Sequence, residues 1–296
     1  NDLSGFGRCS LTAAISVISA MGIQACPLPT AILTAQTGYP HYYLDDYTDK
    51  MDIYRQEWQK MGQHFDGIYT GFVASEAQID QIFHFIDTFY TSDTFLLVDP
   101  VMGDDGIKYD MFTPKLLEKM NALVREADII TPNLTELCLL TDADYDAIID
   151  IADTRILIDV IGELASTLLP PDSDNSNTLD SRQTSKKEKE IIVTGIHCKN
   201  EHGQKMMGNL YVSKDTRKLF AFPHVGGSYS GTGDLFASCI AAGKCRGDGI
   251  PELIQLSGTF LEQAIKDSAE ENVPYPDGTN YEKYLYMLIK NRVLTL

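Results

Sequence analysis

A glycine-rich stretch followed by one acid, GGSYSGTGDLFAS (226–238), is the clearest chemical signal in the sequence. Gly231, Thr232 and Gly233 precede an apolar, Ala-rich run that favours a helix, so their N–H groups would form its unpaired first turn. Such a turn attracts anions, because the helix dipole is positive there and small residues let a phosphate approach closely. Asp234 in the same turn would repel that phosphate, unless it faces a hydroxyl group instead.

Phosphoryl transfer to an alcohol is a reaction that uses both parts of this stretch. A carboxylate takes the hydroxyl proton, while backbone amides hold the charge that develops on the transferred group. The structural alternative is that Asp234 only caps the helix. The two interpretations differ in what they need elsewhere, because a kinase also requires groups that bind metal and nucleotide.

Polar residues gather where two predicted buried strands end. The first group lies in VDPVMGDDG (98–106), and the second lies in ITPNLTELCLL (130–140). The polar residues concerned are Asp99, Asp104, Thr131, Asn133 and Glu136. Sheets of α/β proteins bind ligands at strand ends of this kind, and oxygen ligands suit Mg²⁺, which takes one or two carboxylates plus phosphates. Any one of these acids could be a loop or cap residue, but their grouping favours a kinase site.

The surrounding sequence predicts a scaffold that would hold these residues at strand ends. Short apolar runs alternate with longer stretches of helical period, which is typical of βα units and a mainly parallel sheet. The predicted strands are 67–73, 95–101, 127–133 and 190–196, and the predicted helices are 8–22, 75–91, 113–127 and 152–169. Two more alternating runs, 208–213 and 218–225, predict an antiparallel hairpin at the sheet edge. We expect an α/β fold with a mainly parallel central sheet and helices on both of its faces.

The whole chain, 1–296, is predicted to form a single domain, because it contains no repeat of fixed period. The segment 170–190 is rich in Ser, Asp, Asn and Lys and has almost no apolar content, so we expect a flexible surface insertion there.

Charge and composition exclude several classes of protein. The net charge is −18, from 42 acids against 24 bases, so the chain cannot offer the basic surface that nucleic acids need. It contains neither an apolar run of about 18 residues nor a signal peptide, and we expect a cytoplasmic protein without membrane contact. No two of its six cysteines have the spacing of a metal-binding pair, which is typical of free thiols.

Two common nucleotide-binding motifs are missing. The Gly-Lys pair 243–244 is followed by Cys245, and Ser238 stands where a Walker motif needs its first glycine. The GFG at 5–7 lacks the third glycine of a dinucleotide fingerprint and the acid that follows it.

Four stretches in the same order resemble the vitamin B6 (pyridoxal) kinases of the ribokinase-like superfamily. They are NDLSGFGRCSLTAAISVISAMG (1–22), DPVMGDDG (99–106), ITPNLTEL (130–137) and SGTGDLFAS (230–238). The resemblance covers nearly the whole chain apart from the 170–190 insertion. It implies a ribokinase-like three-layer fold, a homodimer, and ATP- and Mg²⁺-dependent phosphorylation of the 5′-hydroxymethyl group of pyridoxal, pyridoxine or pyridoxamine.

The resemblance also implies roles for individual residues. Asp234 resembles the catalytic base, and Gly231, Thr232 and Gly233 resemble the anion hole. The positions that it implies for ATP binding are Asp104, Thr131, Asn133, Glu136, Thr194 and Gly195. Those for Mg²⁺ are Asp99, Asp104 and Glu136. Those for the B6 ring are Asp2, Ser4, Thr37 and Phe72.

The sequence departs from the family pattern at two places. The strand that precedes NDLSG in the family is absent, so we expect that residues precede Asn1 in the full protein. In TGIHC (194–198) a second small hydroxyl is missing after Thr194, so we expect nucleotide contacts that differ in detail.

Two alternatives remain open from the sequence, a hydroxymethylpyrimidine kinase and a binding protein without turnover, whereas the sugar kinases of the same superfamily fit less well. Hydroxymethylpyrimidine kinases share the fold and an N-terminal D-x-S-G like that of 2–5, but their anion-hole motif typically ends in Cys where Asp234 stands. Ribokinase-type sugar kinases share the Gly-x-Gly-Asp motif but carry an N-terminal Gly-Gly signature that is missing here. The alternative from another class is a protein that binds a B6 vitamer or nucleotide without turnover, and such a protein has no need of a base at Asp234.

Overall fold

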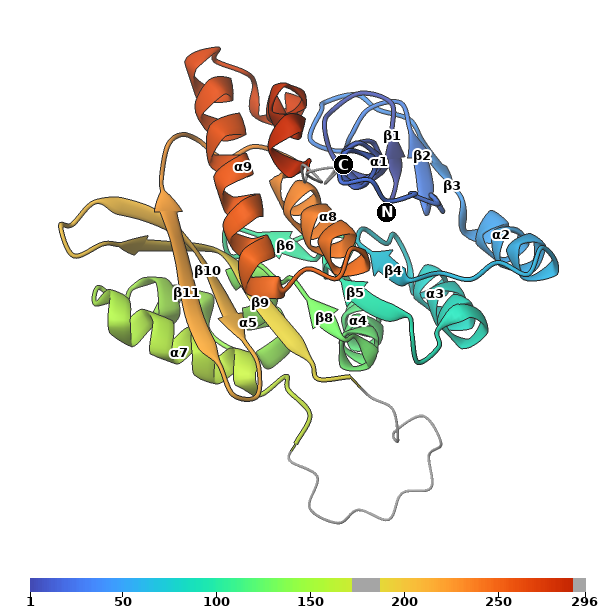
Figure 1. The fold of residues 1–296 in the computed structure, drawn as a ribbon, viewed down its shortest axis with the longest axis horizontal. Coiled ribbons are helices and arrows are strands. Elements are labelled where there is room, and N and C mark those ends of the chain that lie inside the picture. Colours follow the sequence, from blue (N-terminus) through green and yellow to red (C-terminus); the bar gives the residue numbers. More distant parts are fainter. Residues whose placement is uncertain (172–186, 290–296) are drawn as a thin grey trace, which may run out of the picture. The chain divides into compact units, whose positions relative to one another are not determined.

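The computed structural model describes residues 1–171 and 187–289, drawn in colour in Figure 1. These residues form two compact units. The terminal unit comprises 1–63, 71–81 and the chain from 222 onward, and the sheet unit comprises 64–70 and 82–221. Most of the predicted 170–190 insertion, residues 172–186, lies outside the described residues.

The sheet unit is built on six strands in the order β11-β10-β9-β8-β5-β4 (Figure 1). They are β4 (Gly67–Thr70), β5 (Phe95–Val98), β8 (Ile129–Ile130), β9 (Glu190–Lys199), β10 (Lys205–Val212) and β11 (Arg217–Pro223). The pairs β4–β5, β5–β8 and β8–β9 are parallel, whereas β9–β10 is antiparallel. β10 and β11 are neighbours at one edge of the sheet, as the alternating runs 208–213 and 218–225 predict.

Helices and one small hairpin follow the strand ends of the sheet unit. The helices are α4 (Pro114–Glu126), α5 (Leu134–Thr141), α6 (Tyr145–Ile149) and α7 (Thr154–Ser166). α7 packs against β9 and β10 (Figure 1). The hairpin joins β6 (Gly103–Asp104) to β7 (Ile107–Lys108). Its two-residue loop, Asp105 and Gly106, has φ of 48° and 79°, as a tight hairpin turn requires.

The terminal unit contains a second, smaller sheet. Its strands are β1 (Leu3–Ser4), β2 (Ala31–Leu33) and β3 (Leu44–Asp46). β1 and β2 are parallel, and β2 and β3 are antiparallel. None of the three was predicted, because runs of two or three residues are too short for an alternation pattern to appear.

Helices make up the rest of the terminal unit. They are α1 (Ser10–Ala20), α2 (Thr48–Lys60), α8 (Thr232–Cys245) and α9 (Ile250–Glu270), with the 3-10 helices η2 (Tyr275–Asp277) and η3 (Tyr281–Leu288). The remaining helix, α3 (Glu76–Phe89), begins in this unit. α8 packs against both α1 and α9, and Figure 1 shows α8 and α9 side by side. A Cβ atom on Gly243 would lie 2.0 Å from Leu253, so α8 and α9 approach closely at that point.

Among the helices of 1–171 and 187–289, none combines the length and the apolar character needed to cross a bilayer.

Candidate active site

Asp234 lies in the first turn of α8, three residues after the glycine that caps the helix. Gly231 is the N-cap and has a φ of +83°, in the left-handed region. A Cβ atom there would lie 2.1 Å from the carbonyl oxygen of Arg8, so both backbone conformation and space require glycine. No side chain caps the helix. Thr232 and Gly233 therefore present a first turn whose N–H groups suit an anion, as the sequence predicts.

The carboxylate of Asp234 is joined to a buried network of hydroxyl groups. The backbone N–H of Ser10 donates to Asp234 Oδ2 over 2.8 Å. Ser10 Oγ donates to Asp2 Oδ1 over 2.5 Å, and Ser4 Oγ donates to Asp2 Oδ2 over 2.7 Å. The terminal unit thus brings the predicted residues Asp2 and Ser4 into one network with Asp234.

Burial raises the pKa of Asp234 to about 6. The N–H group of Ser10 lowers this pKa by stabilising the charged form, and the nearby charge of Asp2 raises it again. A carboxylate with a pKa near 6 is mostly ionised at neutral pH and yet more basic than an ordinary aspartate. These are the properties of a general base.

In the sheet unit, a second cluster forms where β5 and β8 end. Thr131 Oγ1 donates to Asp99 Oδ1 over 2.8 Å, and both side chains are buried. Asn133 caps α5 and forms a capping box with Glu136, in which each side chain bonds the other's backbone N–H. The second oxygen of Glu136 accepts from the N–H of Met102 over 3.1 Å.

Glu136 is 4% exposed, and this burial raises the pKa of its carboxyl well above the usual value. The charge of Asp99 raises the pKa further, while the N–H groups of Asn133 and Met102 lower it. Asp104 lies in the β6–β7 hairpin with an exposed side chain. The hairpin is fixed near Asn133, whose Nδ2 donates to the carbonyl of Gly103 over 2.8 Å.

Thr194 and Gly195 form a bulge in β9. Val193 pairs with Leu210 and Ile196 pairs with Gly208, so two residues of β9 lie opposite one residue of β10. Gly195 has a φ of +71°, and Thr194 N–H donates to the carbonyl of Pro132 over 2.9 Å. The bulge therefore holds Thr194 beside the segment that leads to Asn133.

The two remaining predicted residues lie in different parts of the terminal unit. Thr37 is exposed in the segment between β2 and β3. Phe72 lies in a loop whose backbone is fixed: its N–H donates to Asn1 Oδ1 over 3.3 Å, and its carbonyl accepts from Thr30 Oγ1 over 3.1 Å.

Sequence reasoning missed two residues that hold these segments. Ser10 bonds both Asp234 and Asp2. The fully buried Gln78 accepts from the N–H of Ala74 and donates to the carbonyl of Thr30. A hydroxyl residue just before an apolar helical run was a signal for Ser10, whereas a glutamine inside a helix gave none.

Carboxylate and amide oxygens are the donors that fit Mg²⁺, and the sheet-unit cluster supplies them at Asp99, Asp104 and Glu136. Within the described part of the chain, His, Cys, Asp and Glu residues do not gather in any group of three placed to hold a metal. An ion that keeps waters and phosphates as ligands needs only one or two of these carboxylates.

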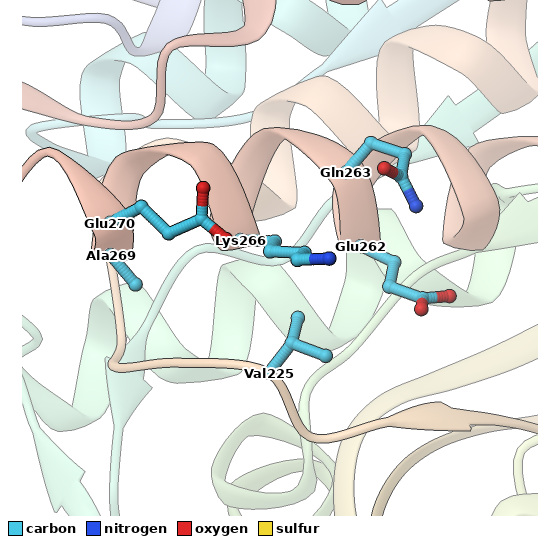
Figure 2. A pocket seen from close by; sticks show the side chains of 6 residues that line it. All are labelled: Val225, Glu262, Gln263, Lys266, Ala269 and Glu270. Carbon is cyan, nitrogen blue, oxygen red and sulfur yellow. The ribbon is translucent and has the colours of Figure 1, made fainter.

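A pocket of about 480 Å³ lies between α9 and the segment that follows β11. Figure 2 shows Lys266 between Glu262 and Glu270 along the helix, with Val225 facing them from the other side. Gln263 and Ala269 complete the lining, and no predicted site residue takes part.

The fold and the glycine-preceded acid define a ribokinase-like α/β kinase, and the predicted fold class is confirmed by solved structures. More narrowly, the chain matches the family model described as phosphomethylpyrimidine kinase over residues 7–169 and 163–275. It therefore belongs to this family.

Similar proteins carry both pyrimidine and pyridoxal names. A Bacteroides thetaiotaomicron protein described as a phosphomethylpyrimidine kinase, solved with pyridoxal, is 32% identical with a TM-score of 0.81 and covers 97% of this chain and 93% of its own. A Schizosaccharomyces pombe protein named as a pyridoxal kinase is 28% identical over 194 residues. That match spans 64% of this chain but only 50% of the yeast relative.

A more distant structure has the same fold. Leishmania donovani pyridoxal kinase, solved with ADP and pyridoxamine, is 19% identical with a TM-score of 0.75, over 97% of this chain and 93% of the other. The relatives and neighbours named as pyridoxal kinases are kinase enzymes.

Proposed function

We propose that this protein transfers the γ-phosphate of ATP to the 5′-hydroxymethyl group of pyridoxal, pyridoxine or pyridoxamine. The observation that carries the proposal is Asp234, a carboxylate with a raised pKa in the uncapped first turn of α8. A base and an anion site in one helical turn are the two parts that phosphoryl transfer to an alcohol requires.

Asp234 takes the proton of the substrate hydroxyl. Its pKa of about 6 keeps it ionised at neutral pH, while the N–H of Ser10 fixes the direction of the carboxylate. The N–H groups of Thr232 and Gly233 hold the negative charge that develops on the transferred group. Because Gly231 has no side chain to cap the helix, these donors are kept for the phosphate.

The sheet-unit cluster is assigned to the nucleotide and its metal. Asp99, Asp104 and Glu136 would hold Mg²⁺, and Thr131, Asn133, Thr194 and Gly195 would contact ATP. When bound, the ion supplies positive charge against the phosphates. Thr131 positions Asp99 through its 2.8 Å hydrogen bond, and Asn133 positions Glu136 through the capping box.

The pyridoxal in the Bacteroides structure supports a B6 substrate over a pyrimidine. Asp2, Ser4, Thr37 and Phe72 are the positions assigned to the ring. The fixed backbone of Phe72, bonded on both sides by Asn1 and Thr30, suits an aromatic side chain that must stay against a flat substrate.

The test is a parallel assay of ATP consumption with pyridoxal, pyridoxine, pyridoxamine and hydroxymethylpyrimidine, with and without Mg²⁺. We expect the highest kcat/KM with one of the three B6 vitamers. A higher value with hydroxymethylpyrimidine would make the protein a pyrimidine kinase. Thermal stabilisation by a vitamer without any ATP consumption would instead show a binding protein.

The proposed assembly is a homodimer, and light scattering coupled to gel filtration would measure it. A molecular mass near twice the 32.9 kDa of this chain is expected.

A further inference from the structure

Asp2 has no carboxylate oxygen left without a hydrogen bond from the protein itself. Oδ1 accepts from Ser10 Oγ over 2.5 Å, and Oδ2 accepts from Ser4 Oγ over 2.7 Å. The side chain is only 6% exposed. Its backbone takes part as well, because the carbonyl of Asp2 accepts from the N–H of Leu11 over 3.0 Å. A carboxylate in this setting is built to hold protein groups in place.

What Asp2 holds is the residue that bonds Asp234. Ser10 has a φ of +48°, in the left-handed region that a residue with a Cβ atom rarely adopts. This conformation persists only where the surroundings impose it. The bonds from Ser10 Oγ to Asp2 and from Ser10 N–H to Asp234 are the contacts that do so.

We propose that Asp2 is a positioning residue for the catalytic base: through its bond to Ser10 Oγ it aims the backbone N–H that holds Asp234. The inference rests on the proposed function, because Asp234 is the base of that reaction. It gives Asp2 a role other than contact with the substrate ring.

The charged and titratable groups that face Asp234 show that Asp2 also acts through its charge. Asp2 raises the pKa of Asp234, and Ser10 N–H lowers it. The neighbouring Cys9 is buried, which raises the pKa of its thiol far above neutral pH and keeps it uncharged. Asp2 is therefore the negative side chain acting on the base, and removing its charge should lower the pKa of Asp234.

The first test measures ionisation directly and does not require turnover. The side-chain ¹³C resonance of Asp234, identified by its loss in Asp234→Asn, is titrated by NMR in the wild type, in Asp2→Asn and in Asp45→Asn. Asp45 lies exposed on β3 of the same unit, so its variant controls for the loss of one charge. We expect a midpoint lower by roughly one unit in Asp2→Asn and unchanged in Asp45→Asn. An unchanged midpoint in folded Asp2→Asn would overturn the charge effect.

The second test concerns the direction of the N–H group. Ser10→Gly and Ser10→Ala both lose the hydroxyl bond to Asp2, but only glycine adopts a φ of +48° without strain. We expect Ser10→Gly to keep kcat about 10-fold higher than Ser10→Ala, with similar KM for the vitamer. Equal kcat values would show that this backbone conformation does not position the base.

A third variant, Asp2→Glu, keeps the charge but displaces it by one methylene group. We expect a lower kcat than in the wild type and a midpoint for Asp234 that stays near the wild-type value. Full wild-type kcat in Asp2→Glu would contradict positioning. If the wild type shows no turnover with any vitamer, the proposed function fails, while the NMR titration still decides the influence of Asp2 on Asp234.

Discussion

Asp234 and Glu136 occupy the same position in two different helices, yet their surroundings differ in one decisive way. Each is the third residue of its helix, α8 and α5 respectively. Glu136 is bound by its own N-cap residue, Asn133, in a local capping box. Asp234 follows a glycine that cannot cap, and its partner is the N–H of Ser10, from the other end of the chain.

The difference shows two settings for an acid in the first turn of a helix, one bonded to its own N-cap residue and one bonded to a distant segment. Glu136 satisfies two backbone donors, the N–H of Asn133 in the capping box and the N–H of Met102 outside it. A glycine cap leaves the N–H groups of α8 for a ligand and leaves Asp234 partly exposed. The position in the helix is the same, so the residue at the N-cap decides which hydrogen-bond partners each acid has.

The largest effect is expected from Asp234→Asn. Asparagine can still accept from Ser10 N–H, so the fold should persist, but the base is lost. We expect kcat to fall by about 10²–10⁴-fold. Assays of ATP consumption with the preferred vitamer measure this fall. Asp45→Asn serves as the control, for which we expect wild-type turnover. Turnover close to wild type would reduce Asp234 to a helix residue like any other.

Gly231→Ala should show how strictly the uncapped turn depends on glycine. The new Cβ would meet the Arg8 carbonyl at 2.1 Å in a backbone conformation with φ of +83°. We expect a loss of about 3 kcal/mol or more in the free energy of unfolding, measured by urea denaturation. Gly233→Ala is the matched control, because a Cβ atom added there would meet no other group within 4 Å. Equal stability of the two variants would mean that the turn can rearrange.

The pH dependence of stability should differ between the wild type and Asp234→Asn. Asp234 has a pKa of about 6 in the folded protein against 3.8 ordinarily. Between these values the folded state binds more protons than the unfolded state, so the free energy of unfolding falls as pH rises. Relative to the wild type, Asp234→Asn should therefore gain stability from pH 4 to pH 7. We expect a gain of about 1–2 kcal/mol after allowing for partial exposure.

Parallel urea titrations at several pH values provide this measurement. The raised pKa of Glu136 acts in the same direction but is common to both proteins, so it cancels in the difference. A stability difference that does not vary with pH would mean that Asp234 titrates normally.

The smallest effect is expected from removing the side-chain cap of α5, which has no counterpart in α8. Asn133→Ala removes the side chain that accepts from Glu136 N–H, and we expect a loss of about 1 kcal/mol. Asn133→Ser restores a capping oxygen and should recover most of that loss. If serine proves no better than alanine, then the bond from Asn133 Nδ2 to Gly103, rather than the cap, stabilises this turn.

Local patterns in the sequence predicted the parts of the fold that depend on local forces. Helix 113–127 is observed at Pro114–Glu126, where Thr113 caps the first turn and accepts from Leu116 N–H. Strand 95–101 shortens to Phe95–Val98, and the side chain of Asp99, directly after it, accepts from Thr131 at the end of the neighbouring strand. A contact between the ends of two strands cannot be predicted from the sequence of either strand alone.

The same holds for the residues of the candidate site. The glycine before Asp234 and the acids after the strands were visible as residue types at strand and helix ends. The bond between Ser10 and Asp234 joins residues 224 positions apart, and the periodicity of apolar residues along the chain does not predict such a contact. The left-handed backbone of Ser10 could not be predicted either, because serine, unlike glycine, rarely adopts a positive φ.

Gly243, where α8 meets α9, bears on how the position of Asp234, the proposed base, can be disturbed. A helix rises 1.5 Å per residue, so this contact lies about 14 Å along the axis from Asp234. Leu253 leaves no room there for even a methyl group. The end of α8 that carries Asp234 is thus held in place partly by packing at the other end of the helix. We therefore expect that substitutions at Gly243, well outside the candidate active site, also lower activity.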